Sequence, residues 1–348
     1  MEYRKLGRSD LTVSELCLGS MTWGGKNTEA EGHAQIDMAL DHGINFIDTA
    51  EMYPSPPLKE TQGATEEIIG SWLAKTGRRD DIVLATKVTG AGNGNVRGRN
   101  GAPISPATIR EAVESSLKRL QTDYIDLYQF HWPNRGSYHF RKYWDYTPEK
   151  RDPSVERAEI VANLETVAAL MQEGKIRAFG NSNETAWGAA KYLEVAETEN
   201  LPRMVSLQNE YSLLCRIYDT DLAELSINED VGLLAYSPLA AGILTGKYQG
   251  DKTPEGSRRA GNSTLGGRLT ENAFPAVDTY LGIAEKHGLD VVQMSLAWCL
   301  TRPFMGSVIF GASSTEQLQR ILKTPEITLS DEVMEDIKQA HRAHPMPI

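Results

Sequence analysis

The chain has 348 residues, with 47 acidic and 36 basic side chains and a net charge of -11. This acidic balance opposes nonspecific attraction to nucleic acid or to an anionic membrane, so we expect neither as a partner and favour a small-molecule substrate. The length exceeds that of a usual domain, but α/β barrels with insertions run from about 200 to over 400 residues as one domain. We therefore expect residues 1–348 to form one domain.

The sequence contains no cysteine pattern, amino-terminal segment or metal-binding motif that points to a special class of protein. The 3 cysteines are far apart and form no Cys-x-x-Cys pair, so neither a disulfide framework nor a zinc ribbon is indicated. No segment approaches the ~18 uninterrupted apolar residues of a membrane span, and no His-Glu-x-x-His metal helix is found. We expect a protein of the reducing cytoplasm that binds no metal.

A regular alternation of apolar runs and helical segments follows a short hairpin. Residues 3–13 alternate weakly about a turn-like Gly-Arg-Ser-Asp, which predicts a hairpin that could plug the floor of the main fold. Eight strand-like runs then occur at 16–19, 44–47, 82–86, 124–130, 176–180, 205–209, 232–236 and 307–311. Helical spacing is found at 33–42, 65–75, 106–120, 155–173, 185–200, 221–230 and 274–287, with a final helix at 331–344. Eight strands, the first seven each followed by a helical segment, predict a closed (β/α)8 barrel, or TIM barrel, with an N-terminal β-hairpin and an extra C-terminal helix.

Three long connections lack convincing periodicity. Residues 90–103 are rich in Gly and Asn, 135–153 carry aromatic and charged residues, and 240–272 are rich in Gly, Lys and Arg. We expect these three segments to be active-site loop insertions that shape a pocket.

Ionisable residues stand where three of the predicted strands end. Asp48 ends the second strand, Lys87 the third and His131 the fourth, while Tyr53 follows Asp48 on the adjoining loop. Parallel strands with intervening helices place all their carboxyl ends on one face, so the four side chains should converge. Singly, each has an ordinary explanation as a cap, a solvated strand end or a core histidine. Jointly, the pattern is much harder to produce by chance.

This quartet suits carbonyl reduction. A phenol can protonate a developing alkoxide, a lysine can lower the pKa of the phenol, and an aspartate can orient the lysine. The hydride must come from a cofactor. No Gly-x-Gly-x-x-Gly follows the first strand, and the segment at 242–247 lacks the spacing of a phosphate loop, with Tyr248 in place of the needed Ser or Thr.

Several motifs resemble the aldo-keto reductase superfamily over essentially the whole chain, and within it the bacterial Tas-like proteins and the potassium-channel β-subunit relatives. They are Leu-Gly-Ser-Met-Thr-Trp-Gly at 18–24, Ile-Asp-Thr-Ala-Glu-Met-Tyr at 47–53, Thr-Lys at 86–87, Asp-Leu-Tyr-Gln-Phe-His-Trp-Pro at 126–133, Gly-Asn-Ser-Asn at 180–183, Gln-Asn at 208–209, Ala-Tyr-Ser-Pro-Leu at 235–239 and Gly-Lys-Tyr at 246–248. The resemblance implies an NADP(H)-dependent reductase of aldehydes or ketones, with Tyr53, Lys87, Asp48 and His131 as the catalytic tetrad and Tyr53 as the acid.

The resemblance also implies a set of cofactor-binding residues. Ser182, Asn183 and Gln208 would hold the nicotinamide carboxamide, and Tyr236 would stack under the ring. The remaining residues implied to bind NADP(H) are Ser237 and Leu239 along the pyrophosphate, Lys247 and Arg258 at the 2'-phosphate, and Gly311, Ser313 and Gln317 in the last cofactor segment. Relatives often show Glu-Asn where this chain has Arg320-Ile321, and Arg320 could add a phosphate contact.

The substrate and the biological role leave alternatives open. Trp23, Met52 and Trp132 suggest an apolar mouth, although aromatic side chains beside strand ends are as often packing residues. The channel β-subunit relatives indicate a second possible role, a nucleotide-sensing binding subunit with slow reductase activity. A structural barrel without nucleotide conflicts with the presence of both the tetrad and the cofactor residues.

Overall fold

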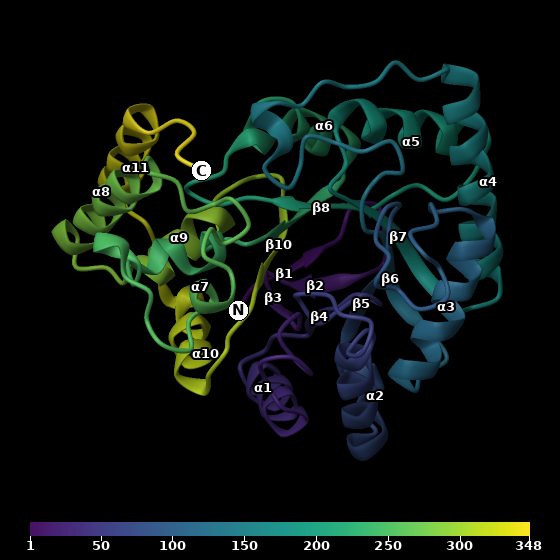
Figure 1. The fold of residues 1–348 in the computed structure, drawn as a ribbon, viewed down its shortest axis with the longest axis horizontal. Coiled ribbons are helices and arrows are strands. Elements are labelled where there is room, and N and C mark those ends of the chain that lie inside the picture. Colours follow the sequence, from purple (N-terminus) through teal and green to yellow (C-terminus); the bar gives the residue numbers. More distant parts are fainter.

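The computed structural model describes all 348 residues and contains a closed barrel of eight parallel strands surrounded by helices (Figure 1). β10 pairs in parallel with both β9 and β3, which closes the ring and confirms the predicted (β/α)8 barrel. The barrel strands are β3 (Leu16–Gly19), β4 (Phe46–Asp48), β5 (Val83–Val88), β6 (Ile125–Phe130), β7 (Ile176–Ser182), β8 (Ser206–Glu210), β9 (Gly232–Tyr236) and β10 (Met305–Phe310).

The helices form the outer layer of the molecule. They are α1 (Glu29–Asp41), α2 (Ala64–Thr76), α3 (Pro106–Leu120), α4 (Pro153–Gln172), α5 (Ala186–Thr198), α6 (Leu222–Glu229), α7 (Arg258–Gly261), α8 (Ala273–Lys286), α9 (Val291–Leu300), α10 (Thr315–Leu322) and α11 (Asp331–Ala343). α1 begins at Glu29 rather than at 33 because Thr28 and Glu31 form a capping box. None of these helices combines the length and the apolar character needed to cross a membrane.

Helix α9 is absent from the predicted elements. It is buried along almost its whole length, and apolar residues therefore surround its axis instead of forming one stripe. A helix of this kind gives no 3.6-residue periodicity in the sequence. Its N-cap, Asp290, accepts hydrogen bonds from the backbone of Val292 and Gln293.

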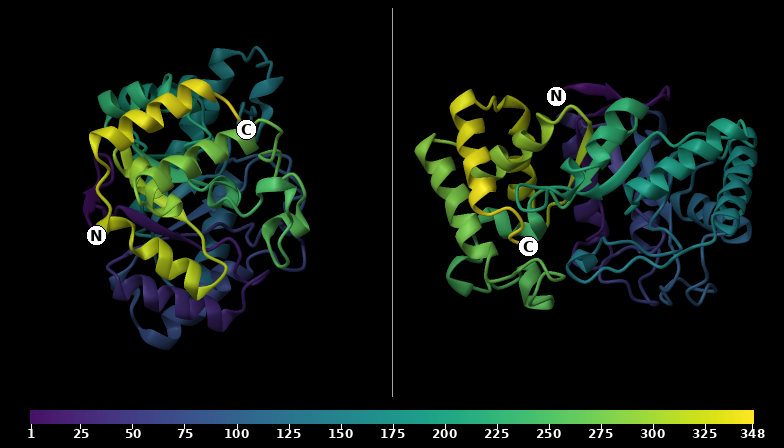
Figure 2. Two further views of the ribbon diagram at one scale, coloured as in Figure 1. Left: turned by 90° about the vertical axis from the view of Figure 1, so that its left-hand side faces the viewer. Right: turned by 90° about the horizontal axis from the view of Figure 1, so that it is seen from above.

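The N-terminal hairpin closes one end of the barrel. β1 (Tyr3–Lys5) and β2 (Thr12–Ser14) pair antiparallel, and Leu6, Leu11 and Val13 pack among interior side chains from the barrel strands. The right-hand view of Figure 2 shows the hairpin at one end of the molecule and the long loops at the opposite end. The expected floor plug is confirmed, and the carboxyl ends of the strands form the other face.

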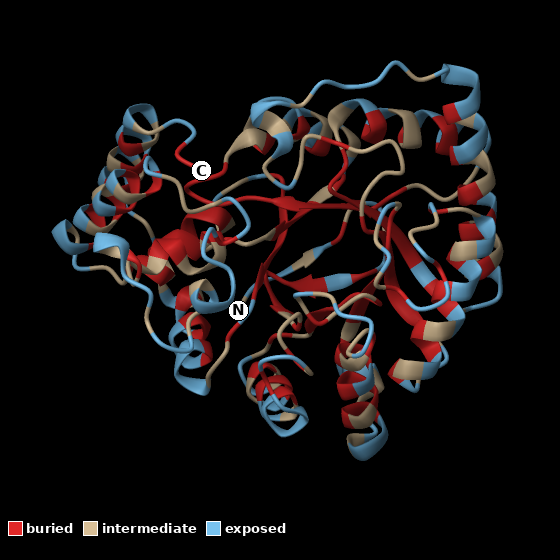
Figure 3. Cartoon of the chain, in the orientation of Figure 1, coloured by how far each residue is buried: buried red, intermediate tan, exposed pale blue.

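The alternation of strand side chains builds a polar layer above this floor. The strands are buried, whereas the outward faces of the helices are exposed (Figure 3). Phe46, Ala85 and Leu127 belong to the apolar floor cluster. The residues two positions further along the same strands are Asp48, Lys87 and Gln129, and their side chains enter the same interior because strand side chains repeat every two residues.

The three predicted insertions contain little regular structure. Residues 90–103 have no helix or strand, 135–153 contain one 3-10 turn at Lys142–Trp144 before α4 begins, and 240–272 contain 3-10 turns and the short helix α7. All three follow carboxyl ends of barrel strands, as predicted.

Candidate active site

A buried ion pair lies at the centre of the barrel mouth. Lys87 Nζ donates to Asp48 Oδ2 at 2.7 Å and to the carbonyl oxygen of Thr49 at 2.7 Å. Both charged side chains are almost completely buried. Burial disfavours the ammonium, but attraction by Asp48 and Tyr53 outweighs this effect, so the pKa of Lys87 is raised and the side chain is charged at neutral pH.

The second oxygen of the Asp48 carboxylate also accepts hydrogen bonds. Asp48 Oδ1 accepts from Gln208 Nε2 at 2.8 Å and from Gln129 Nε2 at 3.3 Å. Gln129 is not among the predicted site residues, because an uncharged residue inside a strand draws no attention by itself. The signal for it is its spacing, two positions before His131.

Tyr53 is held over this ion pair by its own backbone. Its N–H donates to Ala50 O at 3.0 Å and its carbonyl oxygen accepts from Gly63 N at 2.9 Å. The ring centroid lies 5.1 Å from Lys87 Nζ and 5.9 Å from the ring of His131, which it meets edge-on.

Lys87 lowers the pKa of the Tyr53 phenol, as expected, but the net shift in the protein alone is upward. Burial raises the pKa of Tyr53, and the positive charge of Lys87 lowers it only in part, while Asp48 raises it further. Desolvation of a phenolate therefore outweighs the nearby cation. Tyr53 is a neutral phenol at physiological pH, which is the form that can donate a proton.

His131, the fourth residue of the predicted tetrad, also lies at the barrel mouth. The backbone N–H of His131 donates to Val88 O at 3.0 Å, and its backbone carbonyl oxygen accepts from Asn183 Nδ2 at 2.9 Å. Burial and then the charge of Lys87 hold the pKa of His131 well below its ordinary value, so the imidazole is neutral. Its Nδ1 is buried without a hydrogen-bond partner.

The residues predicted to hold a carboxamide lie beside the tetrad in one hydrogen-bond network. Ser182 Oγ donates to Gln208 O at 2.7 Å, and Tyr236 Oη donates to Asn183 Oδ1 at 2.7 Å. Gln208 Oε1 accepts no hydrogen bond from the protein and is not among the buried unpartnered atoms. A free acceptor therefore remains among groups that are otherwise satisfied.

The two basic residues that are predicted to bind the 2'-phosphate form no ion pair, unlike a neighbouring arginine. Lys247 is half-buried, Arg258 is exposed on α7, and neither forms an ion pair, whereas the adjacent Arg259 pairs with Asp251. Partial burial lowers the pKa of Lys247. Both side chains thus keep their donors available for an anion.

The other predicted pyrophosphate residues lie on the same connection after β9. Ser237 follows Tyr236 directly and has a positive φ of 53°, and Leu239 precedes a 3-10 turn at Ala240–Thr245. They are half-buried at the open face of the barrel.

The last predicted cofactor segment follows β10. Gly311 is exposed, and Gln317 Oε1 accepts from Ser313 N at 3.0 Å and from Ser313 Oγ at 3.1 Å. Arg320 Nε donates to Asp290 Oδ2 at 2.7 Å, in an exposed ion pair with the N-cap of α9. Nη1 and Nη2 of Arg320 donate no hydrogen bond within the protein, so the suggested phosphate contact of Arg320 stays a prediction.

Two of the three predicted substrate residues lie at the mouth. The ring of Trp132 lies 4.9 Å from that of His131, and Met52 Sδ accepts from Asn93 Nδ2 at 3.7 Å. Trp23 does not belong there. It is completely buried and donates from Nε1 to Gln35 Oε1 at 3.0 Å, so it packs the core next to α1.

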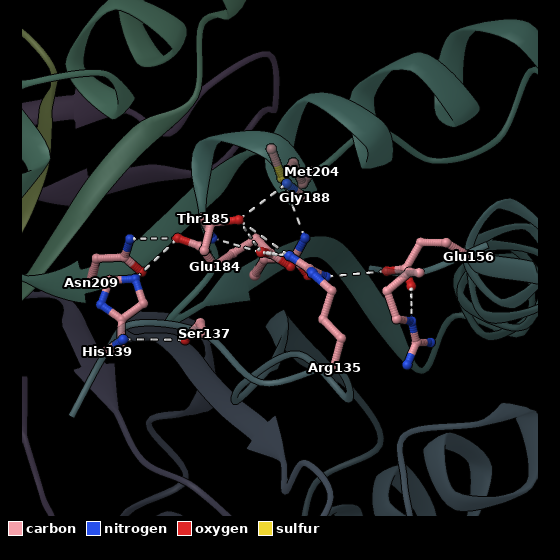
Figure 4. A network of polar contacts seen from close by, with 11 residues as sticks. Arg135, Ser137, His139, Glu156, Glu184, Thr185, Gly188, Met204 and Asn209 are labelled. Atoms are coloured by element: carbon pink, nitrogen blue, oxygen red, sulfur yellow. Dashed lines mark hydrogen bonds and ion pairs between the residues drawn. The ribbon is translucent and has the colours of Figure 1, made fainter. Parts of the chain in front are cut away.

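The insertion at 135–153 is anchored to the β7–α5 connection (Figure 4). Arg135 forms ion pairs with the buried carboxylates of Glu184 and Glu156. His139 Nε2 lies 3.1 Å from Glu184 O, and Asn209 Nδ2 donates to the same carbonyl oxygen at 3.0 Å. These contacts fix one end of the insertion beside the barrel mouth.

A second anchor joins two insertions to each other. Glu210, the last residue of β8, is buried and pairs with Arg141 from the segment 135–153 and with Arg268 from the segment 240–272. Arg268 Nε and Nη2 lie 2.8 and 2.9 Å from the two carboxylate oxygens. This triad was not predicted because its partners are 69 and 58 residues from Glu210 in the sequence.

The chain is thus a (β/α)8-barrel protein with a phenol, a lysine–carboxylate pair and a neutral imidazole at the open face of its barrel. The family model for the Aldo/keto reductase family matches residues 15–342, and the chain belongs to this family.

Similar proteins extend over almost the whole chain. The chain is 45% identical to Protein tas of Escherichia coli over 352 residues, covering 100% of this chain and 99% of that protein. It is 35% identical to the uncharacterized oxidoreductase YrpG of Bacillus subtilis, covering 96% and 94%. It is 32% identical to a probable voltage-gated potassium channel subunit beta of Arabidopsis thaliana, covering 99% and 98%. Each of these relatives is thus covered over at least 94% of its length, and one of them carries the name of an oxidoreductase.

Proposed function

We propose that the protein reduces aldehydes or ketones to alcohols with NADP(H), and that Tyr53 is the general acid. The observation that carries this proposal is the position of Tyr53, whose ring lies 5.1 Å from Lys87 Nζ and 5.9 Å from the ring of His131. An acid, a cation and a neutral hydrogen-bonding group therefore surround the place where a carbonyl oxygen would develop negative charge.

Each member of the tetrad has a distinct part in the proton transfer. Tyr53 gives its proton to the alkoxide oxygen, and the positive charge of Lys87 then stabilises the phenolate. Asp48 holds Lys87 charged and in place through the 2.7 Å contact. The neutral imidazole of His131 orients the carbonyl oxygen by a hydrogen bond without adding a second positive charge.

The residues at the mouth fit a nicotinamide cofactor, which supplies the hydride when bound. The free acceptor Gln208 Oε1 supports carboxamide binding by Ser182, Asn183 and Gln208, with Tyr236 under the ring. Lys247 and Arg258 have no carboxylate partner, which supports NADP over NAD. We assign the rest of the cofactor site to Ser237, Leu239, Gly311, Ser313 and Gln317.

The substrate is, in this proposal, a small carbonyl compound that enters past Met52 and Trp132. Cys17, Cys215 and Cys299 are buried and unpaired, which supports a reducing compartment such as the cytoplasm. Nucleic acid and membrane surfaces are not proposed as partners, since the net charge of -11 disfavours both.

The similarity to a potassium channel β subunit favours a second candidate, a nucleotide-sensing subunit with slow reduction. Both candidates bind NADP(H), so turnover distinguishes them. Purified protein should be tested for NADPH oxidation against aldehydes, ketones and sugars, and its bound nucleotide identified.

The two candidates predict different results in this experiment. Multiple turnovers that are lost in Tyr53→Phe support the reductase, and tight nucleotide binding with no turnover supports the sensor. Absence of NADP(H) binding would contradict both.

A further inference from the structure

Gln129 lies fully buried in the barrel interior, on β6 between Lys87 of β5 and Gly180 of β7. Its Nε2 donates to Asp48 Oδ1 at 3.3 Å, and its Oε1 accepts from Gln208 Nε2 at 3.2 Å. The side-chain amide of Gln129 therefore contacts both the carboxylate of the buried ion pair and the amide of Gln208.

These contacts determine which way the amide of Gln208 faces. An amide nitrogen has two hydrogens, and Gln208 Nε2 uses them on Asp48 Oδ1 at 2.8 Å and on Gln129 Oε1 at 3.2 Å. A flipped amide would place Gln208 Oε1 against two other oxygens, one of them ionised. The network therefore fixes Gln208 Oε1 as an acceptor that reaches the barrel mouth.

The position of Gln129 is itself restricted by packing. A Cβ at Gly180 would lie 2.4 Å from Ser206 Oγ, and Gln129 Cγ passes 3.5 Å from the same point. The first distance would be a clash and the second is an ordinary van der Waals contact, so the lack of a side chain at position 180 makes room for Ser206, and Gln129 packs beside this position. An apolar residue at 129 would remove a donor from Asp48 and the acceptor that holds Gln208.

We propose that Gln129 is a positioning residue, which holds Gln208 Oε1 as the acceptor for the carboxamide NH2 of the nicotinamide. This inference rests on the proposed function, because it assumes that NADP(H) binds at this mouth. It makes recognition of the carboxamide depend on a residue that does not touch the cofactor. Since both amides donate to Asp48, the same side chain links the ion pair to the cofactor site.

The test compares two ligands and needs no turnover. NADP+ and its acetylpyridine analogue, in which a methyl group replaces the carboxamide NH2, are titrated calorimetrically into the wild type and into Gln129→Met, an unbranched variant of similar size. The wild type should prefer NADP+ by about fivefold to tenfold, the worth of one hydrogen bond. In Gln129→Met this preference should fall to about twofold or less, mainly through weaker NADP+ binding, since Gln208 is free to rotate.

A second variant, Gln129→Glu, distinguishes the proposed role of Gln129 from misfolding and from a purely structural role. Gln129→Glu retains an oxygen that accepts from Gln208, and because two buried carboxyl groups this close share a proton, it also keeps a donor towards Asp48. It should therefore keep most of the preference for NADP+ even if its melting temperature falls. Equal binding of the two ligands by the wild type, an unchanged preference in Gln129→Met, or loss of the preference in Gln129→Glu would overturn the role of Gln129. No binding of NADP+ by the wild type would overturn the proposed function itself, and this inference with it.

Discussion

Lys87 and Asp48 form a buried ion pair across neighbouring strands, although they are 39 residues apart in the sequence. Nζ and Oδ2 lie 2.7 Å apart, and neither side chain can reach bulk water. The pair is therefore both a structural element of the barrel interior and the source of the positive charge next to Tyr53.

Replacing Lys87 with Met should reduce both activity and stability. The change leaves the Asp48 carboxylate buried without its cation, which costs about 3 to 5 kcal/mol, and removes the charge that stabilises the phenolate. Urea unfolding measures the first effect and steady-state reduction the second.

Two further variants check the ion-pair interpretation. Lys338→Met, which breaks an exposed pair with Glu335, should change stability by less than about 1 kcal/mol. The double variant Lys87→Met/Asp48→Asn should regain stability without regaining activity. A Lys87→Met protein as active as the wild type would contradict the proposed role.

Tyr53→Phe removes only the phenolic oxygen. It should lower the rate of carbonyl reduction by about 10²- to 10⁴-fold, because general acid catalysis is lost, and leave NADPH affinity nearly unchanged. Steady-state kinetics with the best panel substrate and a fluorescence titration of NADPH would measure the two effects. A rate loss smaller than about tenfold would mean that another group donates the proton.

The pH profile of reduction should be flat around neutrality. His131 has a pKa well below its ordinary value of about 6.5, so no inflection should occur near that pH. Tyr53 and Lys87 both have raised pKa values, so the rate should fall only above about pH 10. An inflection near pH 6.5 in kcat/KM that disappears in His131→Asn would show that the imidazole does titrate in this range.

The free energy of unfolding should fall at alkaline pH because Lys87 loses its proton there. Because the folded-state pKa of Lys87 is raised, its contribution is fully present below the unfolded pKa of about 10.4 and is lost as pH rises through the folded value. Urea midpoints measured from neutral to alkaline pH should fall less in Lys87→Met than in the wild type. Parallel curves for the two proteins would contradict this linkage.

Lys247→Ala/Arg258→Ala should weaken NADPH binding by about 1.5 to 3 kcal/mol for each charged hydrogen bond lost, and leave NADH binding almost unchanged. Fluorescence titration of both nucleotides checks this. Arg259→Ala is the matched control, since Arg259 lies on the same short helix but is paired with Asp251. Equal losses for NADPH and NADH would show that the two residues shape the loop rather than bind the 2'-phosphate.

Glu210→Gln should destabilise the protein by about 3 to 5 kcal/mol, because Arg141 and Arg268 would face each other in a buried site without their shared carboxylate. Chemical unfolding measures the loss. Glu199→Gln, which breaks an exposed pair with Arg157, should cost less than about 1 kcal/mol. Similar losses in the two variants would mean that the Glu210 triad carries no special stability.

The barrel and the tetrad positions could be predicted because both depend on short-range patterns. Strand runs ending in Asp48, Lys87 and His131 are visible in the sequence, and parallel topology brings their ends together. The pKa direction of Tyr53 could not be predicted, since it depends on how far burial outweighs the charge of Lys87. The sequence likewise could not distinguish Trp132 at the mouth from Trp23 in the core, because the difference depends on tertiary packing and not on a local sequence pattern.

The family match begins at residue 15, whereas the hairpin of residues 3–14 supplies Leu6, Leu11 and Val13 to the barrel interior. The boundary of the family model is therefore not the boundary of the folding unit. A truncated protein beginning at residue 15 would leave Phe46 and Leu127 facing an open hole, one side-chain layer below Asp48 and Lys87. Water entering from beneath would solvate that ion pair, so an expression boundary chosen by alignment would alter the electrostatics of the opposite end of the barrel.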